Sequence, residues 1–289
     1  MLALGVFAIG WSALFVRWSG VPGWTSAFWR MTIAQLVFVP WAMGANRGRG
    51  RPNAAATRAA IIAGVFFAAD LALFNTAVMV SSAANATLLG TNAPLFVALG
   101  AWLLYRERPT SRFWAGFVVS FLGMVAIVGR DLMQHPRLGL GDAFAVAGAA
   151  CYAGYLLYVR QSRADMDALT FSAISGVAAS VTLLAICLVI GTPLVGFPSQ
   201  SWWALIGLAL VTQVVGHLSI AHSLGRLPVS VTSIVLLGQA PITAVLAVPL
   251  LGERLDALQI VGGLLVLAGI YVVNSRPRSP AAEGEPLLE

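Results

Sequence analysis

Ten stretches of about 20 mostly apolar residues follow one another along this chain of 289 residues, and they limit its possible folds more than any other feature. About 20 residues is the length that an α-helix needs to cross the hydrocarbon core of a bilayer. We therefore expect an all-α polytopic membrane protein with ten transmembrane helices. Nine is the alternative count, because the gap at 80–82 is short. The stretches lie near residues 2–18, 24–44, 58–79, 83–105, 112–129, 141–160, 168–190, 201–222, 229–250 and 257–275.

Composition leads to the same class of protein. Hydrophobic residues make up 59% of the chain and charged residues only 10%, whereas soluble domains carry about 25% charged residues. The net charge of +6 comes entirely from arginine, because the sequence has no lysine. These arginines lie in short gaps between apolar stretches, which indicates membrane orientation and argues against nucleic-acid binding.

The distribution of arginine predicts the orientation. If the N-terminus is cytoplasmic, only Arg17, Arg130, Arg137 and Arg254 lie in segments outside the cell, and the other loop arginines lie inside. Cytoplasmic loops are rich in arginine and lysine, so we expect both termini to be cytoplasmic. Arg30 falls within the second stretch, and we interpret it as a side chain that extends to the lipid headgroups. Residues 277–289 are predicted to be a disordered cytoplasmic tail.

The two halves of the chain resemble each other. Residues 88–94 (LLGTNAP) align with residues 235–241 (VLLGQAP), and a Glu-Arg pair follows at 107–108 and at 253–254. Gly116 and Gly123 align with Gly262 and Gly269. We predict a repeat at 1–133 and a second at 134–276. Five spans is an odd number, so the second repeat is inverted relative to the first, as in many secondary transporters.

Ionisable residues inside the apolar stretches are few, and such residues usually face a cavity or a partner. Asp70 lies in the middle of the third stretch and His217 in the middle of the eighth. The two halves align with an offset of 147 residues. In this alignment Asp70 corresponds to His217, and Asn75 corresponds to His222. One interpretation is a hydrogen bond between helices without a role in transport. The other is substrate contact or proton relay.

The fourth and ninth stretches carry further polar residues and a proline. Asn85 and Asn92 are seven residues apart and share a helix face. A proline inside a helix frees the carbonyl four residues earlier, which could contact a substrate, but it could also form an ordinary packing kink. The candidates for substrate binding or translocation here are Asn85 and Asn92 with their counterparts Thr232 and Gln239, and the candidate helix breaks are Pro94 and Pro241.

Aromatic residues form a third set of candidates. Trp11 lies in the first stretch, and Tyr152, Tyr155 and Tyr158 follow one side of the sixth. They would suit an apolar or aromatic substrate, or a cation above the ring faces. Tyrosine and tryptophan also mark membrane interfaces, which is the competing interpretation.

A proline-containing span that ends in Glu-Arg and precedes a glycine-spaced span occurs twice, from Pro94 to Gly123 and from Pro241 to Gly269. This pattern resembles the drug/metabolite transporter superfamily, and within it the ten-helix EamA-type transporters. The sequence is most similar to the bacterial exporters of aromatic and other amino acids. The resemblance implies secondary export of neutral amino acids or similar metabolites across the inner membrane, with cationic drugs or other metabolites as the alternative.

Other function classes find little support in the sequence. A membrane enzyme or a channel is the distant alternative: there is no HExxH, no GxSxG and no pair of close intramembrane carboxylates. A nucleotide-driven pump needs a P-loop lysine, and this chain has no lysine. We expect no cofactor, no metal and no catalytic residue. The partners expected are a small-molecule substrate and the lipid bilayer. Proton coupling, facilitated movement and the oligomeric state stay open.

Overall fold

The computed structural model describes residues 1–45, 52–80, 89–90, 92–134, 139–251 and 257–275, and every element in these ranges is helical. The predicted tail at 277–289 lies outside them. The elements are α1 (Leu2–Gly10), α2 (Ser12–Ser19), α3 (Gly23–Ala45), α4 (Ala54–Val80), α6 (Ala93–Tyr105), α7 (Ser111–Gln134), α8 (Leu140–Ser162), α9 (Ala168–Ile190), α10 (Ser199–Gly207), the π-helix η1 (Leu208–His217), α11 (Leu218–Leu224), α12 (Val229–Val235), the 3₁₀ turn η2 (Leu236–Gly238), α13 (Gln239–Leu251) and α14 (Ala257–Asn274).

Within the described ranges, seven helical segments are long and apolar enough to cross a membrane. Two shorter apolar helices, Ala93–Tyr105 and Ser111–Ile127, accompany them. The helix α3 is not among the seven, and it carries Arg30 and Gln35 in its interior. The structure is thus that of an all-helical protein with several possible spans, and the count of ten stays a prediction. The seven segments are Leu2–Ser19, Ala54–Phe74, Leu140–Ser162, Ala168–Ile190, Ser199–Leu224, Val229–Leu250 and Ala257–Asn274.

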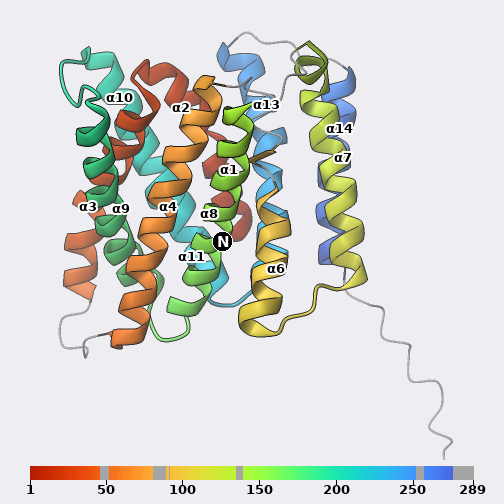
Figure 1. The fold of residues 1–289 in the computed structure, drawn as a ribbon, viewed down its shortest axis with the longest axis horizontal. Coiled ribbons are helices and arrows are strands. Elements are labelled where there is room, and N and C mark those ends of the chain that lie inside the picture. Colours follow the sequence, from red (N-terminus) through yellow and green to blue (C-terminus); the bar gives the residue numbers. More distant parts are fainter. Residues whose placement is uncertain (46–51, 81–88, 91, 135–138, 252–256, 276–289) are drawn as a thin grey trace, which may run out of the picture.

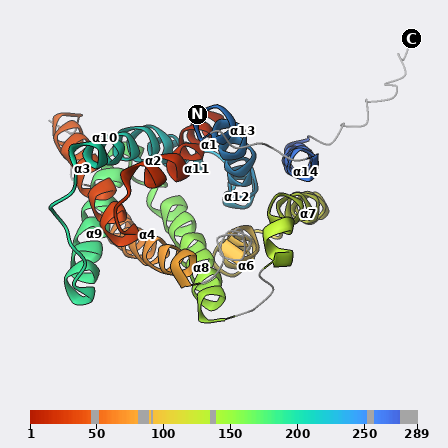
Figure 2. The same cartoon turned by 90° about the horizontal axis from the view of Figure 1, so that it is seen from above.

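The helices stand side by side in one bundle (Figure 1). Extensive contacts join α4 to α8, α3 to α9 and α7 to α14. Seen from above, α7 and α14 form one end of the bundle, and α3 and α9 form the other (Figure 2). A large apolar core that draws on α1, α3, α4, α8, α9 and α11 lies toward the second end. Polar side chains on those same helices are therefore brought into the interior.

Glycine allows α7 and α14 to approach closely. A Cβ added at Gly116 would lie 2.6 Å from the carbonyl oxygen of Gly269, and one added at Gly123 would lie 2.5 Å from that of Gly262. Backbone contact of this kind is how small residues pack helices in membranes. These four glycines therefore serve packing within the chain.

Three breaks interrupt helices that the sequence predicts as continuous. Trp11 separates α1 from α2, and its N–H bonds to the carbonyl of Ala8, three residues earlier. The ten residues of η1 form a π-helix, a rare conformation that is frequent at functional sites. The turn η2 separates α12 from α13.

The two prolines occupy equivalent places at the starts of helices. Pro94 stands in the first turn of α6, and Pro241 stands in the first turn of α13, directly after η2. Both candidate helix breaks thus lie at the start of a helix, and their role in substrate contact stays a prediction. A proline in the first turn costs no hydrogen bond, since the N–H groups there have no partner in the helix.

Asp167 caps the start of α9 outside the membrane-spanning segments. Its carboxylate accepts hydrogen bonds from the backbone N–H of Leu169 and Thr170, each at 3.0 Å, and from the Thr170 hydroxyl at 2.6 Å. Partial burial raises the pKa of Asp167, but these hydrogen bonds and Arg163 outweigh it and hold the pKa below its usual value. Folding therefore favours the ionised form.

We expect Asp167→Ala to lower the free energy of unfolding by about 1 kcal/mol. Because the folded pKa is depressed, the stabilisation by Asp167 is present above the unfolded pKa of about 4 and is lost as the pH falls through the folded value. Thermal unfolding in detergent at neutral pH and near pH 3 measures both effects. Asp165→Ala is the control, since its side chain makes no hydrogen bond in the part of the chain that the structure describes. Equal stability of the two variants at neutral pH would contradict the assignment.

Candidate functional site

Arg30 is the centre of a buried polar cluster. It lies in α3 with only 6% of its surface exposed, although it stands seven residues after the helix start at Gly23. Its Nε donates to Oε1 of Gln213 at 3.0 Å, and one terminal nitrogen donates to the Ser12 hydroxyl at 3.4 Å. The other terminal nitrogen lies 3.2 Å from Nδ1 of His217. The expectation that Arg30 extends to the headgroups is therefore wrong: its hydrogen-bond partners lie inside the bundle.

The π-helix η1 supplies two of these three partners. Gln213 and His217 are four residues apart and both are buried. Nδ1 of His217 also lies 3.0 Å from the carbonyl oxygen of Thr212. Because arginine only donates, the tautomer protonated on Nε2 accepts from Arg30, and the one protonated on Nδ1 donates to Thr212 instead. His217 thus has one partner on α3 and one on its own helix.

Asp70 faces the same cluster from α4. It interacts electrostatically with Arg30 and with Tyr152, and its Oδ1 lies against the backbone of Gly148 in α8. Among the described residues its carboxylate forms neither a hydrogen bond nor an ion pair within 4 Å. Its side chain is only half-buried.

Aromatic rings surround the charged groups. The Phe67 ring centroid is 4.6 Å from that of Tyr155 and 4.9 Å from that of His217. Tyr152 and Tyr155 stack at 5.8 Å, and the Arg30 guanidinium carbon lies 5.8 Å from the centre of the Phe67 ring. Of the aromatic candidates, the structure thus brings Tyr152 and Tyr155 to Arg30 and Asp70.

The other candidates lie elsewhere or outside the described side chains. Trp11 packs between Phe7 and Phe15, with centroids at 6.5 and 6.0 Å, although the next residue, Ser12, contacts Arg30. The remaining candidates are Asn92, whose Nδ2 donates to the carbonyl of Leu89; Gln239, at the start of α13; Thr232, which is buried and donates to the carbonyl of Pro228; Asn75, whose side chain is not described; and Asn85, which lies outside the described residues.

Sequence reasoning missed Arg30, Gln213 and Ser12 as members of the site. Arg30 carried a usable signal, because it is the one arginine well inside an apolar stretch. Gln213 and Ser12 are common polar residues, and only the packing of η1 and of the α1–α2 junction against α3 brings them to the guanidinium. Their role could not be seen from spacing alone.

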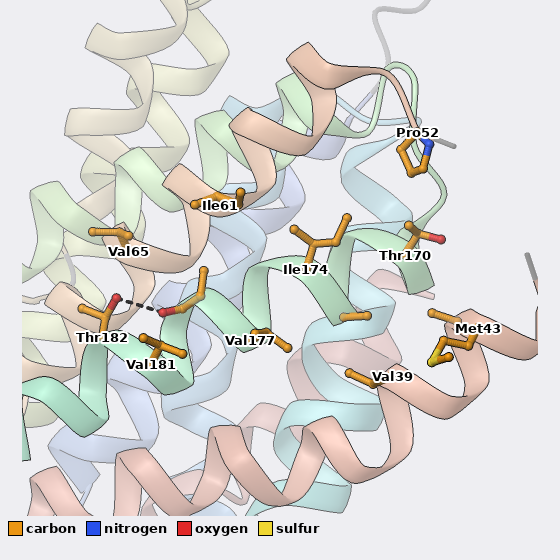
Figure 3. Close-up of a pocket in the computed structure, with 13 residues that line it drawn as sticks. Val39, Met43, Pro52, Ile61, Val65, Thr170, Ile174, Val177, Val181 and Thr182 are labelled. Carbon is orange, nitrogen blue, oxygen red and sulfur yellow. Dashed lines mark hydrogen bonds between the residues drawn. The ribbon is translucent and has the colours of Figure 1, made fainter. Parts of the chain in front are cut away.

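An apolar cavity of about 760 Å³ lies apart from these polar residues, between α3, α4 and α9 (Figure 3). Ile61 and Val181, which line it, are 45% and 62% exposed, so it opens at the surface. The Thr182 hydroxyl in its wall is already bonded to the carbonyl of Ala178 at 2.8 Å. None of the described residues that line this cavity is charged, so they do not supply the groups that would orient a polar substrate.

The EamA-like transporter family matches residues 1–129 and 139–275. The chain belongs to the EamA-like transporter family. This confirms the resemblance seen in the sequence.

Relatives and a solved structure agree with that assignment. An uncharacterized transporter of Archaeoglobus fulgidus is 23% identical over 86% of this EamA-like chain and 87% of its own length. A probable terminal-alkyne amino-acid exporter of Streptantibioticus cattleyicolor is 27% identical over 67% of this chain and 65% of its own. A solved crystal structure, 18% identical over 94% of both chains, superimposes with a TM-score of 0.77 and shares the fold.

Proposed function

We propose that this EamA-like transporter is a secondary carrier that exports amino acids or similar small metabolites across the bacterial inner membrane by alternating access. The observation that carries the proposal is the cluster around Arg30. It joins Asp70 from the first half of the chain to Tyr152, Tyr155 and His217 from the second. A carrier binds its substrate between its two halves, and charged groups inside a membrane protein usually mark its pathway.

The helix contacts support two inverted repeats at 1–133 and 134–276. If the second half copies the first, α3 corresponds to α9, and α7 to α14. Both of these pairs pack together. The contact of α4 with α8 then has its counterpart in the contact of α10 and η1 with α2 and α1, and both are present.

The glycine contacts have the same symmetry. Gly116 meets Gly269 and Gly123 meets Gly262, while the alignment pairs Gly116 with Gly262 and Gly123 with Gly269. If each glycine is replaced by its aligned counterpart in the other half, the contact of Gly116 with Gly269 becomes the contact of Gly262 with Gly123. Two contacts that are related in this way are expected around a two-fold axis. When two similar halves are related by a two-fold axis in the membrane plane, each half can adopt two slightly different packings. If the halves swap these packings, the central site opens first to one side of the membrane and then to the other.

The arginines support cytoplasmic termini. The start of α4 and the ends of α6, α8 and α11 lie at the same end of the bundle (Figure 1). The arginines near these helix ends outnumber those toward the opposite end, where Arg17 lies in the last turn of α2 and Arg130 lies near the end of α7. By the positive-inside rule the arginine-rich end is cytoplasmic. Among the described residues, the arginines near that end are Arg58, Arg106, Arg108, Arg112, Arg160, Arg163 and Arg226.

A carrier of cationic drugs is the second candidate, since Asp70 and the surrounding aromatic rings could bind a cation. The buried guanidinium of Arg30 opposes it, because two like charges in a poorly screened interior repel strongly. A substrate with an anionic group fits the cluster better. The named activity of the Streptantibioticus relative also favours amino acids.

Counterflow in proteoliposomes tests the proposal. Vesicles preloaded with unlabelled threonine, methionine, phenylalanine or tryptophan are given the same amino acid in labelled form. We expect at least one of the four to drive uptake of label well above that of empty vesicles. No exchange of any of them, by protein shown to be folded, would overturn amino-acid transport. Efficient exchange of a cationic dye in the same vesicles would favour the second candidate.

A further inference from the structure

The Arg30 guanidinium is a buried charge whose hydrogen-bond acceptors are all neutral. They are the Gln213 amide, the Ser12 hydroxyl and the His217 ring. Within the described ranges no carboxylate lies within 4 Å of it, and the acid that faces it, Asp70, interacts only at longer range. A buried charge is costly without an opposite charge in contact. Among the described residues, the guanidinium therefore lacks an anion in contact with it.

The guanidinium also has N–H donors that are not used by these three partners. Arginine carries five N–H groups in a planar fork, and three are directed at Gln213, Ser12 and His217. One N–H remains on each terminal nitrogen. Two donors on neighbouring nitrogens match the two oxygens of a carboxylate, which arginine binds with particular strength. The three neutral partners hold the guanidinium in place and leave its charge available.

Asp70 offers the complementary group. Asp70 interacts electrostatically with Arg30 without an ion pair within 4 Å, and the residue is half-buried. A negative and a positive charge in one cluster suit a small molecule that carries both signs. The Phe67 ring lies beside the guanidinium and stacks with Tyr155, which provides an apolar wall for the rest of the substrate.

We propose that Arg30 is the specificity-determining anchor for the carboxylate of a zwitterionic α-amino acid, whose ammonium group Asp70 receives. Gln213 and His217 are positioning residues that orient the guanidinium. This inference rests on the proposed function and narrows its substrate class. Amines and amino-acid amides lack the carboxylate, and N-acyl amino acids lack the ammonium, so the site discriminates against both.

The test uses the best substrate of the counterflow panel with its amide and its N-acetyl derivative as competitors. In the wild-type protein we expect each derivative to compete at least about tenfold more weakly than the parent amino acid, since each loses one charge-assisted contact. In Arg30→Gln the preference for the amino acid over its amide should fall to near unity. Arg58→Gln, at the exposed start of α4, is the matched control and should keep the wild-type preference.

The outcomes separate this inference from the proposed function. If no amino acid exchanges in the wild type, the proposed function fails first. If amino acids exchange but amides compete equally well, the carrier stands and the anchor is refuted. Retention of the tenfold preference by folded Arg30→Gln would also refute it. Should that variant fail to fold, the wild-type competitor series can still refute the anchor, because equal competition by amides would show that the carboxylate is not recognised.

Discussion

Replacement of Asp70 by asparagine is expected to lower amino-acid counterflow at least about tenfold while expression and folding stay near wild-type. Asparagine keeps the shape of the side chain and removes its charge. A hydrogen bond to a charged group contributes about 1.5–3 kcal/mol, and each 1.4 kcal/mol is a factor of ten in affinity. Since no described residue bonds to the Asp70 carboxylate, little of the loss should come from folding.

The same variant separates substrate contact from proton relay. Counterflow exchanges one substrate molecule for another and needs no net proton movement, whereas uptake driven by a proton gradient does. A substrate contact predicts that both activities fall together. A relay predicts that only gradient-driven uptake is lost. Asp165→Asn is the control for the chemical change, because Asp165 lies in the exposed loop before α9. Unaltered counterflow in Asp70→Asn would remove Asp70 from the substrate site.

Gly123→Ala is expected to destabilise the protein by forcing α7 and α14 apart. Its Cβ would lie 2.5 Å from the carbonyl oxygen of Gly262 and 2.7 Å from the backbone nitrogen of Val266. Neither atom belongs to a flexible side chain, so α7 and α14 must separate. Overpacking of this kind costs about 1–3 kcal/mol, which should appear as a lower melting temperature in detergent.

Gly44→Ala provides the matched comparison. Gly44 is also helical, near the end of α3, but a Cβ there meets nothing within 4 Å. Alanine favours the helix over glycine, so this variant should melt at or above the wild-type temperature. Equal melting of the two variants would show that the close contact of α7 with α14 does not hold this end of the bundle together.

Much of the helical layout follows from the sequence, because apolar runs of span length have few alternative structures in lipid. The predicted stretch at 168–190 coincides with α9 (Ala168–Ile190), and that at 257–275 ends within a residue of α14 (Ala257–Asn274). The breaks were harder to predict. The π-helix of η1 leaves no mark in composition, and the break at Trp11 follows Gly10, although glycine also occurs inside helices that stay continuous, such as Gly64 in α4.

The residues of the candidate site also divide into those that the sequence predicts and those that it does not. Asp70, His217, Tyr152 and Tyr155 were singled out because polar and aromatic groups in mid-span are conspicuous. Arg30 was misassigned, since an arginine near the start of a span usually extends to the interface. Its burial depends on acceptors supplied by α2 and η1, which are distant in sequence. Such contacts between helices cannot be read from the spacing within one helix.

Accessibility of a single thiol beside Arg30 tests alternating access most directly. Ser12→Cys, in protein whose Cys151 and Cys187 are both replaced by alanine, places the thiol where the Ser12 hydroxyl contacts the guanidinium. We predict that a membrane-impermeant thiol reagent labels this cysteine from either side of oriented vesicles, and that saturating amino acid slows labelling from both. Labelling from one side only, unaffected by substrate, would contradict a central site that opens in turn to each face.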